Sequence, residues 1–179
     1  MARLLHALVL GLVGAGIVHI AVLLLVPSYS QRDAWSALSE RSNYYIVTRL
    51  DPPGSEPLIG SIDPLFRAVA CRFALEYGPV RMSGQGEVPY WSISVYDRAG
   101  RNIFSVNDRS TSDGALDFVV ATPVQMIELR NDLPPAFDRS VFVEADIGEG
   151  IIVARAFVPD PSWEPTVSRY LQGIACEAG

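Results

Sequence analysis

An apolar run without a formal charge, Leu4–Val26, stands near the start of the sequence. At about 1.5 Å of rise per residue, a helix of this length spans a hydrocarbon layer of ~30 Å with some tilt. A cleaved signal peptide is the alternative, with Ser28 and Ser30 forming a weak small-residue pattern before Gln31. The apolar core of a signal peptide is only about 7–15 residues long, which is shorter than this run. We therefore interpret residues 1–26 as a cytoplasmic tip followed by an uncleaved transmembrane anchor.

The charges that flank this run predict its orientation. Arg3 and the amino terminus precede it, whereas Arg32 beyond it is next to Asp33. Positive charge favours the cytoplasmic side of a membrane. We expect a single-pass protein of the bacterial inner membrane with a cytoplasmic N-terminus. Residues 27–42 are predicted to form a juxtamembrane linker, in which Asp33 caps a short helix through Arg41. Residues 43–179 are predicted to form a periplasmic domain.

Small residues recur every four positions within the anchor, at Ala7, Gly11 and Ala15, followed by His19. Such a ridge lets a second helix approach closely, and a polar side chain at membrane depth usually needs a partner. The ridge therefore predicts association between anchors. The alternative is that small residues are simply common in membrane helices and that His19 is a tolerated neutral imidazole.

Alternating apolar residues beyond the anchor predict strands. The clearest is Val88–Asp97, in which Trp91, Ile93 and Val95 share one face; the turn Asp97–Gly100 then leads into Arg101–Val106. Further strands are predicted at Asn43–Leu50, Cys71–Tyr77, Val80–Met82, Ala115–Ala121, Val124–Leu129, and at Ser140–Asp146 and Ile151–Val158 as a second hairpin.

Helical signals are few. Proline after Asp63 predicts a short helical turn, and Ser162 is predicted to cap a helix over Trp163–Gln172 that stops at Gly173. The fold class is therefore mainly β: an antiparallel, jelly-roll-like β-sandwich with short flanking helices, preceded by one N-terminal transmembrane helix.

The sequence has two cysteines, Cys71 and Cys176, and both follow the anchor. In an oxidising compartment such a pair can form a disulfide. Two buried free thiols are the alternative.

Two segments, CRFALEYGPVRM and VPYWSISVYDRAGRNIFSVNDR, resemble a bacterial family known as domain of unknown function 1254, which often neighbours domain 1214. The resemblance covers roughly Asp63 to Val158, and the size of the chain resembles the small membrane-anchored form. The resemblance implies a β-sandwich. It implies no activity and no catalytic residue.

Composition excludes much chemistry. Both histidines, His6 and His19, are in the anchor, so the domain has no histidine for a Ser-His-Asp or Cys-His site or for binding a metal. The chain has no lysine for a Schiff base. Its net charge is −6, which argues against binding nucleic acid. We expect no cofactor and no metal.

Carboxylates remain as candidate catalytic groups. Asp97, Asp108 and Asp113 lie on or beside the predicted hairpin. Two carboxylates across a cleft can hydrolyse a glycosidic bond, which makes Asp97 and Asp108 the candidate catalytic residues. The alternative is that they are solvated turn residues.

Candidate ligand-binding residues lie on the same hairpin. Tyr90 and Tyr96 share a face that could stack a sugar or an apolar ligand, and Arg98 and Arg109 could hold an anion. The first hypothesis is a non-catalytic periplasmic scaffold, accessory subunit or lipid- or glycan-binding module, with an envelope protein or a second copy as partner. The rival hypothesis is a carboxylate-dependent hydrolase acting on envelope glycan.

Overall fold

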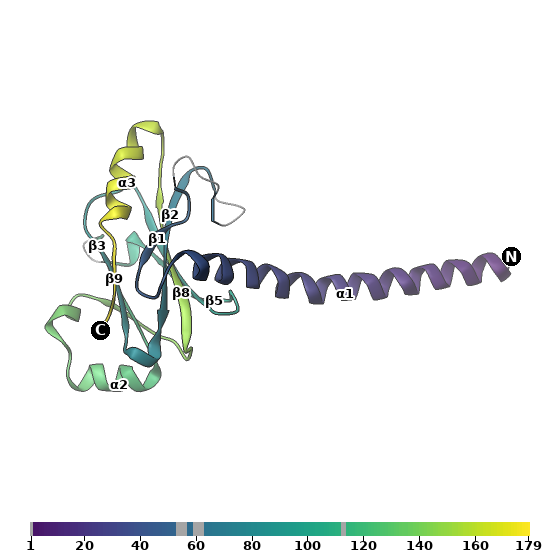
Figure 1. The fold of residues 1–179 in the computed structure, drawn as a ribbon, viewed down its shortest axis with the longest axis horizontal. Helices are drawn as coiled ribbons and strands as arrows, with labels where there is room; N and C mark the ends of the chain where they lie inside the picture. Colours follow the sequence, from purple (N-terminus) through teal and green to yellow (C-terminus); the bar gives the residue numbers. More distant parts are fainter. Residues whose placement is uncertain (1, 53–56, 59–62, 112–113) are drawn as a thin grey trace.

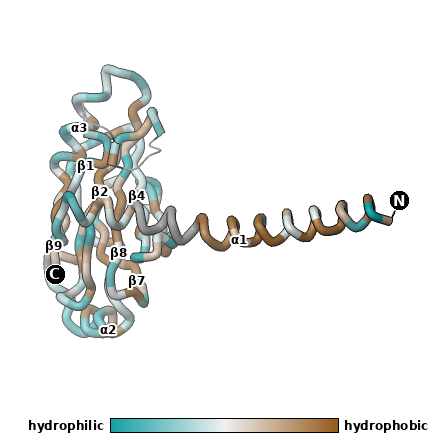
Figure 2. Tube along the Cα trace, turned by 45° about the vertical axis from the view of Figure 1, so that its right-hand side comes forward, coloured by the Kyte–Doolittle hydropathy of each residue, from teal (hydrophilic) through white to brown (hydrophobic). Residues whose placement is uncertain are grey.

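The computed structural model of the chain describes residues 2–52, 57–58, 63–111 and 114–179, with the side chains of residues 27–33 outside that description. A long N-terminal helix, α1 (Ala2–Arg41), projects from a body of two stacked sheets (Figure 1). Its segment Ala2–Val26 is long and apolar enough to cross a membrane, and none of its most apolar window is buried in the body (Figure 2). The fold therefore has an apolar N-terminal helix and a separate β-rich body.

Helix α1 continues without a break from the apolar segment to Arg41. The sequence predicted a separate short helix after Asp33, but the whole stretch 27–41 is helical. Pro27 removes one backbone donor from the helix. The turns beyond it are held because Trp35 and Leu38 pack against the body. The stretch predicted as a linker is thus a helical continuation of the apolar segment.

The first sheet has five antiparallel strands in the order β1-β2-β8-β4-β5. The second sheet has four in the order β7-β6-β3-β9, with β6 and β7 parallel and the other pairs antiparallel. The strand bounds are β1 Val47–Arg49, β2 Phe66–Ala74, β3 Val80–Gly84, β4 Trp91–Asp97, β5 Asn102–Asn107, β6 Leu116–Ala121, β7 Val141–Glu144, β8 Glu149–Phe157 and β9 Ala175–Ala178.

Two short helices lie at opposite ends of the body, α2 (Pro123–Asn131) and α3 (Glu164–Gln172) (Figure 1). Short 3-10 turns complete the described elements: η1 Leu75–Tyr77, η2 Asp108–Ser110, η3 Pro135–Phe137 and η4 Pro161–Trp163. The prediction of a mainly β fold with short helices behind an N-terminal apolar helix is confirmed. The second sheet differs from the antiparallel prediction because α2 connects β6 to a parallel neighbour.

The core between the sheets follows the alternation of the strands. Trp91, Ile93 and Val95 point inward from β4 and pack with residues of both sheets and of α3. Ser92 and Ser94 belong to the opposite face. The predicted hairpin of β4 and β5 is also present, with Asn107 opposite Ser92.

The stretch Val124–Leu129, predicted as a strand, belongs to helix α2, so that prediction is wrong. Thr122 caps the helix: its hydroxyl accepts from the backbone N–H of Gln125, and the Gln125 side chain accepts from the Thr122 N–H. This reciprocal pair satisfies two N-terminal donors. Met126 and Leu129 are buried at helical spacing. The cap at Thr122 favours a helix more strongly than the β-branched residues of this stretch favour a strand.

The predicted second hairpin is also wrong, because β7 and β8 belong to different sheets. Asp63-Pro64 forms a turn rather than a helix, in which the Asp63 carboxylate accepts from the Leu65 N–H at 2.9 Å, and β2 begins directly afterwards. The helix predicted after Ser162 is present as α3, but Asp160 rather than Ser162 supplies the side-chain cap of the preceding turn. Strand β9 was not predicted.

Candidate functional site

The two candidate catalytic carboxylates, Asp97 and Asp108, lie at opposite ends of the β4–β5 hairpin. Asp97 ends β4, whereas Asp108 follows Asn107, which is opposite Ser92 at the start of β4. At about 3.3 Å per residue the two positions are about 20 Å apart. Paired carboxylates of glycosidases are only about 5–9.5 Å apart. The structure therefore does not bring these two carboxylates together as a pair, and Asp113 lies outside the described residues.

Asp97 closes the hairpin turn. Its carboxylate accepts hydrogen bonds from the Arg101 backbone N–H at 2.8 Å and from the Arg101 Nε–H at 2.7 Å. Burial opposes ionisation of this group, but the bonds from Arg101 outweigh it and lower the pKa of Asp97. A carboxyl group with a lowered pKa is ionised at neutral pH and has no proton to donate. Asp97 therefore stabilises the turn.

Tyr90 and Tyr96 also lie apart. The Tyr90 ring makes an edge contact with Phe66, with ring centroids 6.2 Å apart. Tyr96 packs against the cluster around Leu38 at the end of α1, and its hydroxyl accepts from Arg155 at 3.4 Å. The structure places the two tyrosines in separate surroundings rather than in one aromatic site.

The two candidate arginines separate in the same way. Arg98 forms an ion pair with Glu149, with Nη1 and Oε2 2.8 Å apart, and its guanidinium lies 5.4 Å from the centroid of the Trp35 ring. Arg109 is exposed beside Asp108 on η2. Arg98 thus contacts α1, and Arg109 does not share its surroundings.

The last turns of α1 lie on the outer face of the first sheet. Leu38 is only 3% exposed and packs in a cluster with Leu50, Ala68, Ala70, Ile151 and Val153. The small side chains of Ala68 and Ala70 on β2 let the helix approach the sheet closely. We call this contact, with Trp35, Tyr44, Arg72, Arg98 and Glu149 around it, the anchor junction.

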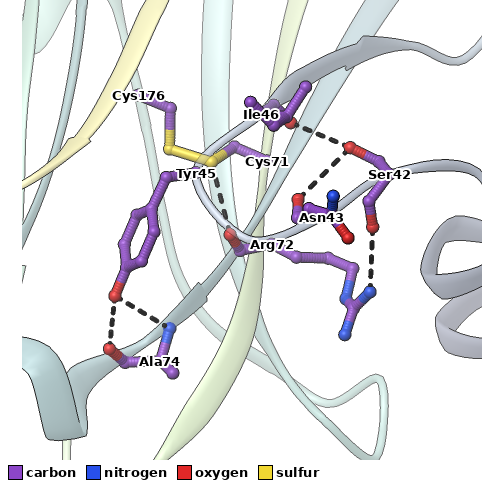
Figure 3. The surroundings of a disulfide bond; sticks show 8 residues. All are labelled: Ser42, Asn43, Tyr45, Ile46, Cys71, Arg72, Ala74 and Cys176. Carbon is purple, nitrogen blue, oxygen red and sulfur yellow. Dashed lines mark hydrogen bonds between the residues drawn. A yellow bond between two sulfur atoms is a disulfide. The ribbon is translucent and has the colours of Figure 1, made fainter.

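Arg72 is the centre of the anchor junction. Its guanidinium carbon lies 4.7 Å from the centroid of the Trp35 ring and 4.5 Å from that of Tyr44. Its Nη1 donates to the Ser42 carbonyl at 3.0 Å, and the residue is only 8% exposed (Figure 3). A desolvated cation over an aromatic ring gains about 2 kcal/mol. Arg72 therefore links α1, the segment after it and β2.

Glu149 completes the junction from β8. It accepts a hydrogen bond from the Tyr44 hydroxyl and pairs with Arg98. The bond to Glu149, together with burial, raises the pKa of Tyr44, so the phenol remains a donor. Charged and aromatic groups from α1, β2, β8 and the hairpin turn thus contact one another at one place.

The chain turns sharply between α1 and β1. Tyr45 has a φ of 61°, a left-handed conformation that costs a non-glycine residue roughly 1–2 kcal/mol. Its N–H donates to the Arg72 carbonyl at 2.8 Å, and its hydroxyl donates to the Ala74 carbonyl at 2.6 Å (Figure 3). These bonds to β2 hold the strained turn. The direction of α1 relative to the sheets is consequently fixed by several contacts.

A disulfide joins Cys71 on β2 to Cys176 on β9, with their α-carbons 6.5 Å apart (Figure 3). The structure therefore has the disulfide rather than two buried free thiols. It connects the first sheet to the second, and Cys71 is the immediate neighbour of Arg72. Helix α1 is thereby linked through β2 to both layers of the body.

Sequence reasoning did not assign a role to Arg72, Tyr44 or Glu149. One signal for Arg72 was present. It is a charged residue within an otherwise apolar stretch of β2, next to Cys71 and two positions after Ala70. A cation in such a place needs a nearby partner. The identity of that partner depends on α1, which is distant in the sequence.

Comparisons with curated proteins, solved structures and family models place the chain among known proteins. None of the curated proteins matches the chain. The VPA0106 protein from Vibrio parahaemolyticus has a similar fold, with a TM-score of 0.60 at 13% identity, over 86% of this chain and 36% of that one. An uncharacterized protein from Burkholderia cenocepacia has a TM-score of 0.46 at 17% identity, over 75% of this chain and 37% of that one.

The chain thus spans little more than a third of each of these solved proteins, and the first of them shows a shared fold alone. The model of the family described as "Protein of unknown function (DUF1254)" matches residues 69–178, which include both cysteines and all strands from β3 to β9. The chain therefore belongs to the DUF1254 family.

Proposed function

We propose that this chain is a single-span inner-membrane protein whose β-sandwich is a non-catalytic accessory subunit, held in a fixed orientation on the periplasmic side for an envelope protein partner. The anchor junction is the observation that supports this proposal. Arg72 lies between Trp35 and Tyr44, so helix, connecting turn and sheet are joined at one buried point. A tethered enzyme needs only a flexible linker, whereas a subunit that positions a partner benefits from a rigid one.

The geometry of α1 supports a defined distance from the membrane. Trp35 follows Val26, the last residue of the apolar segment, by about 13 Å at the helical rise of about 1.5 Å per residue. The first sheet contacts α1. The second sheet, which includes β9, lies on the other side of the body (Figure 1). The second sheet and α2 are therefore the surfaces that we propose for partner contact.

The candidate carboxylates also favour a non-catalytic role. Asp97 and Asp108 are at opposite ends of a hairpin, and Asp97 is engaged by Arg101. No observation in the described residues favours the rival glycan hydrolase.

Photo-cross-linking in native membranes tests the proposal. The chain has no lysine, so amine-reactive reagents do not suit it. A photoreactive residue in place of Val124, which is 67% exposed on α2, is combined with an affinity tag before α1. The buried Met126 on the same helix is the matched control position.

We expect one protein partner joined at position 124 and none at position 126. Adducts with lipid or glycan alone at position 124 would contradict the accessory-subunit proposal. Orientation is checked with Val124→Cys and an impermeant maleimide: labelling in cells with a permeabilised outer membrane supports the periplasmic placement, and labelling only after lysis contradicts it.

A further inference from the structure

Strand β5 is an edge of the first sheet, and its outer side pairs with no strand among the described residues. An open edge carries backbone N–H and C=O groups that can bind a further strand, and proteins usually protect it with a short strand or a charge. The other edge strands that the structure describes have both protections. They have three or four residues and contain Arg49 in β1, Glu144 in β7 and Glu177 in β9. Strand β5 has six residues and no charge.

The core is incompletely covered along β5. Phe104 and Val106 pack against the main core but are only partly buried. Phe104 stacks on Phe118 of β6, with ring centroids 5.9 Å apart, so its ring lies between the two sheets. Ile103 is 37% exposed. A strand added beside β5 would both pair its free backbone groups and cover these apolar side chains.

A second copy of the chain is the occupant that fits this edge. Two identical strands pair antiparallel around a two-fold axis perpendicular to their sheet. Rotation about this axis keeps the outer faces of both first sheets on the same side. Helix α1 leaves the body from that side, away from the second sheet (Figure 1). Both apolar segments therefore enter the same membrane in the same direction, a step that rests on the membrane span of the proposed function.

We propose that two copies of this chain form a dimer in which their β5 strands pair antiparallel and join the first sheets into one continuous sheet. A two-fold antiparallel ladder has one residue opposite itself, and we assign Ser105 to that position. Phe104 of each copy is then opposite Val106 of the other, an aromatic and β-branched pair that stabilises a sheet. These residues belong to Phe104–Asn107, the part of β5 in regular register with β4.

The side chain of Ser105 is suitably placed for a cross-linking test. It is exposed, and its hydroxyl donates to the Ser94 hydroxyl at 2.9 Å, so it lies on the outer face of the first sheet. Directly opposite residues of an antiparallel pair have α-carbons about 4.5–5.5 Å apart. This distance suits a disulfide. The two copies of Ile103 would be about 14 Å apart along the strands, which is too far for a disulfide.

The first experiment is mild oxidation of full-length cysteine variants in native membranes, followed by a non-reducing gel. We expect Ser105→Cys to give a covalent dimer and Ile103→Cys, the matched control, to give none. The dimer should persist when Gly11→Leu is added, because β5 is separate from the small-residue ridge of α1. Absence of a dimer with Ser105→Cys, or equal dimer from both cysteine variants, would overturn the proposal.

The second experiment measures energy transfer between labelled copies in membranes. Ser105→Glu places two like charges opposite each other, and we expect about fivefold weaker association. Ser110→Glu adds the same charge on η2, outside β5, and should leave association unchanged. Equal association of the two variants would overturn the proposal. Neither experiment uses position 124, so a failure of β5 pairing is distinct from a failure of the accessory-subunit proposal.

Discussion

The guanidinium of Arg72 on β2 lies 4.7 Å from the centre of the Trp35 ring on α1, although the two residues belong to different layers of the protein. One comes from the sandwich and the other from the long N-terminal helix that begins with the apolar segment. Because Tyr44 covers Arg72 as well, at 4.5 Å, a cation from the sheet is enclosed by aromatic rings on the anchor side. This contact joins the end of α1 to the first sheet of the sandwich.

Replacing Trp35 by alanine should release the end of α1. The substitution removes the ring over Arg72 and part of the cover on the Leu38 cluster, at a cost of about 2 kcal/mol. That change corresponds to about 30-fold faster opening. Hydrogen exchange of the amides of residues 38–41 should accelerate by this factor. Trp163→Ala, in the distant turn η4, should leave these amides unchanged, and equal effects of both variants would contradict the role of Trp35.

Reducing the disulfide should weaken the whole body. The bond closes a loop of 105 residues between β2 and β9. A loop of this length predicts a loss of about 4–5 kcal/mol in the free energy of unfolding. Denaturant unfolding with and without reductant measures it. The double variant Cys71→Ser, Cys176→Ser is the control and should not respond to reductant; an unchanged midpoint of the unsubstituted chain on reduction would contradict the prediction.

Asp117 should make stability depend on pH in the acid range. Burial opposes its ionisation, but bonds from Arg81 at 2.9 and 2.6 Å and from Ser140 at 2.6 Å outweigh it and lower its pKa. A lowered folded pKa gives stability that is fully present above the unfolded value of about 3.9 and is lost as the pH falls through the folded value.

Asp117→Asn should therefore be less stable than the unsubstituted chain at pH 7, and the difference should shrink below about pH 4. Urea unfolding of the two proteins at several pH values measures this difference in stability and its dependence on pH. Asp138→Asn, at an exposed position, is the control. A difference that stays constant or grows in acid would show that the carboxylate does not act through its charge.

Association through the anchor remains a prediction from the small-residue ridge. Ala7, Gly11, Ala15 and His19 lie on the part of α1 that is exposed along its length, and a Cβ on Gly11 would meet nothing within 4 Å. Gly11→Leu should weaken a dimer measured by energy transfer in membranes. Gly16→Leu is the matched control because it lies off the ridge. Equal dimerisation of both variants and of the unsubstituted chain would contradict a role of the small-residue ridge in association.

The sequence was most informative where local patterns decide the structure. Alternation at Trp91, Ile93 and Val95 predicted the core face of β4, and the turn after Asp97 predicted its hairpin partner. The charge-free run predicted the exposed apolar helix. Each of these features is determined by residues that are close together in the sequence.

The elements that were missed depend on distant contacts. Strand β9 is short and shows little alternation, and it is held by β3 and by the bond from Cys176 to Cys71. Helix α2 contains β-branched residues that favour a strand, and its cap at Thr122 decides against it. The role of Arg72 required knowing that the last turns of α1 pack on the outer face of the first sheet.

A distance measurement across the anchor junction tests the central claim most directly. Spin labels at Val22→Cys in the membrane segment and Arg130→Cys on α2 can be added because the native cysteines are bonded to each other. Pulsed electron resonance in lipid nanodiscs then gives the distribution of distances. We expect one narrow distribution for the otherwise unsubstituted chain and for the control Arg155→Met, and a broad one for Arg72→Met. A broad distribution in all three proteins would contradict a rigid anchor junction.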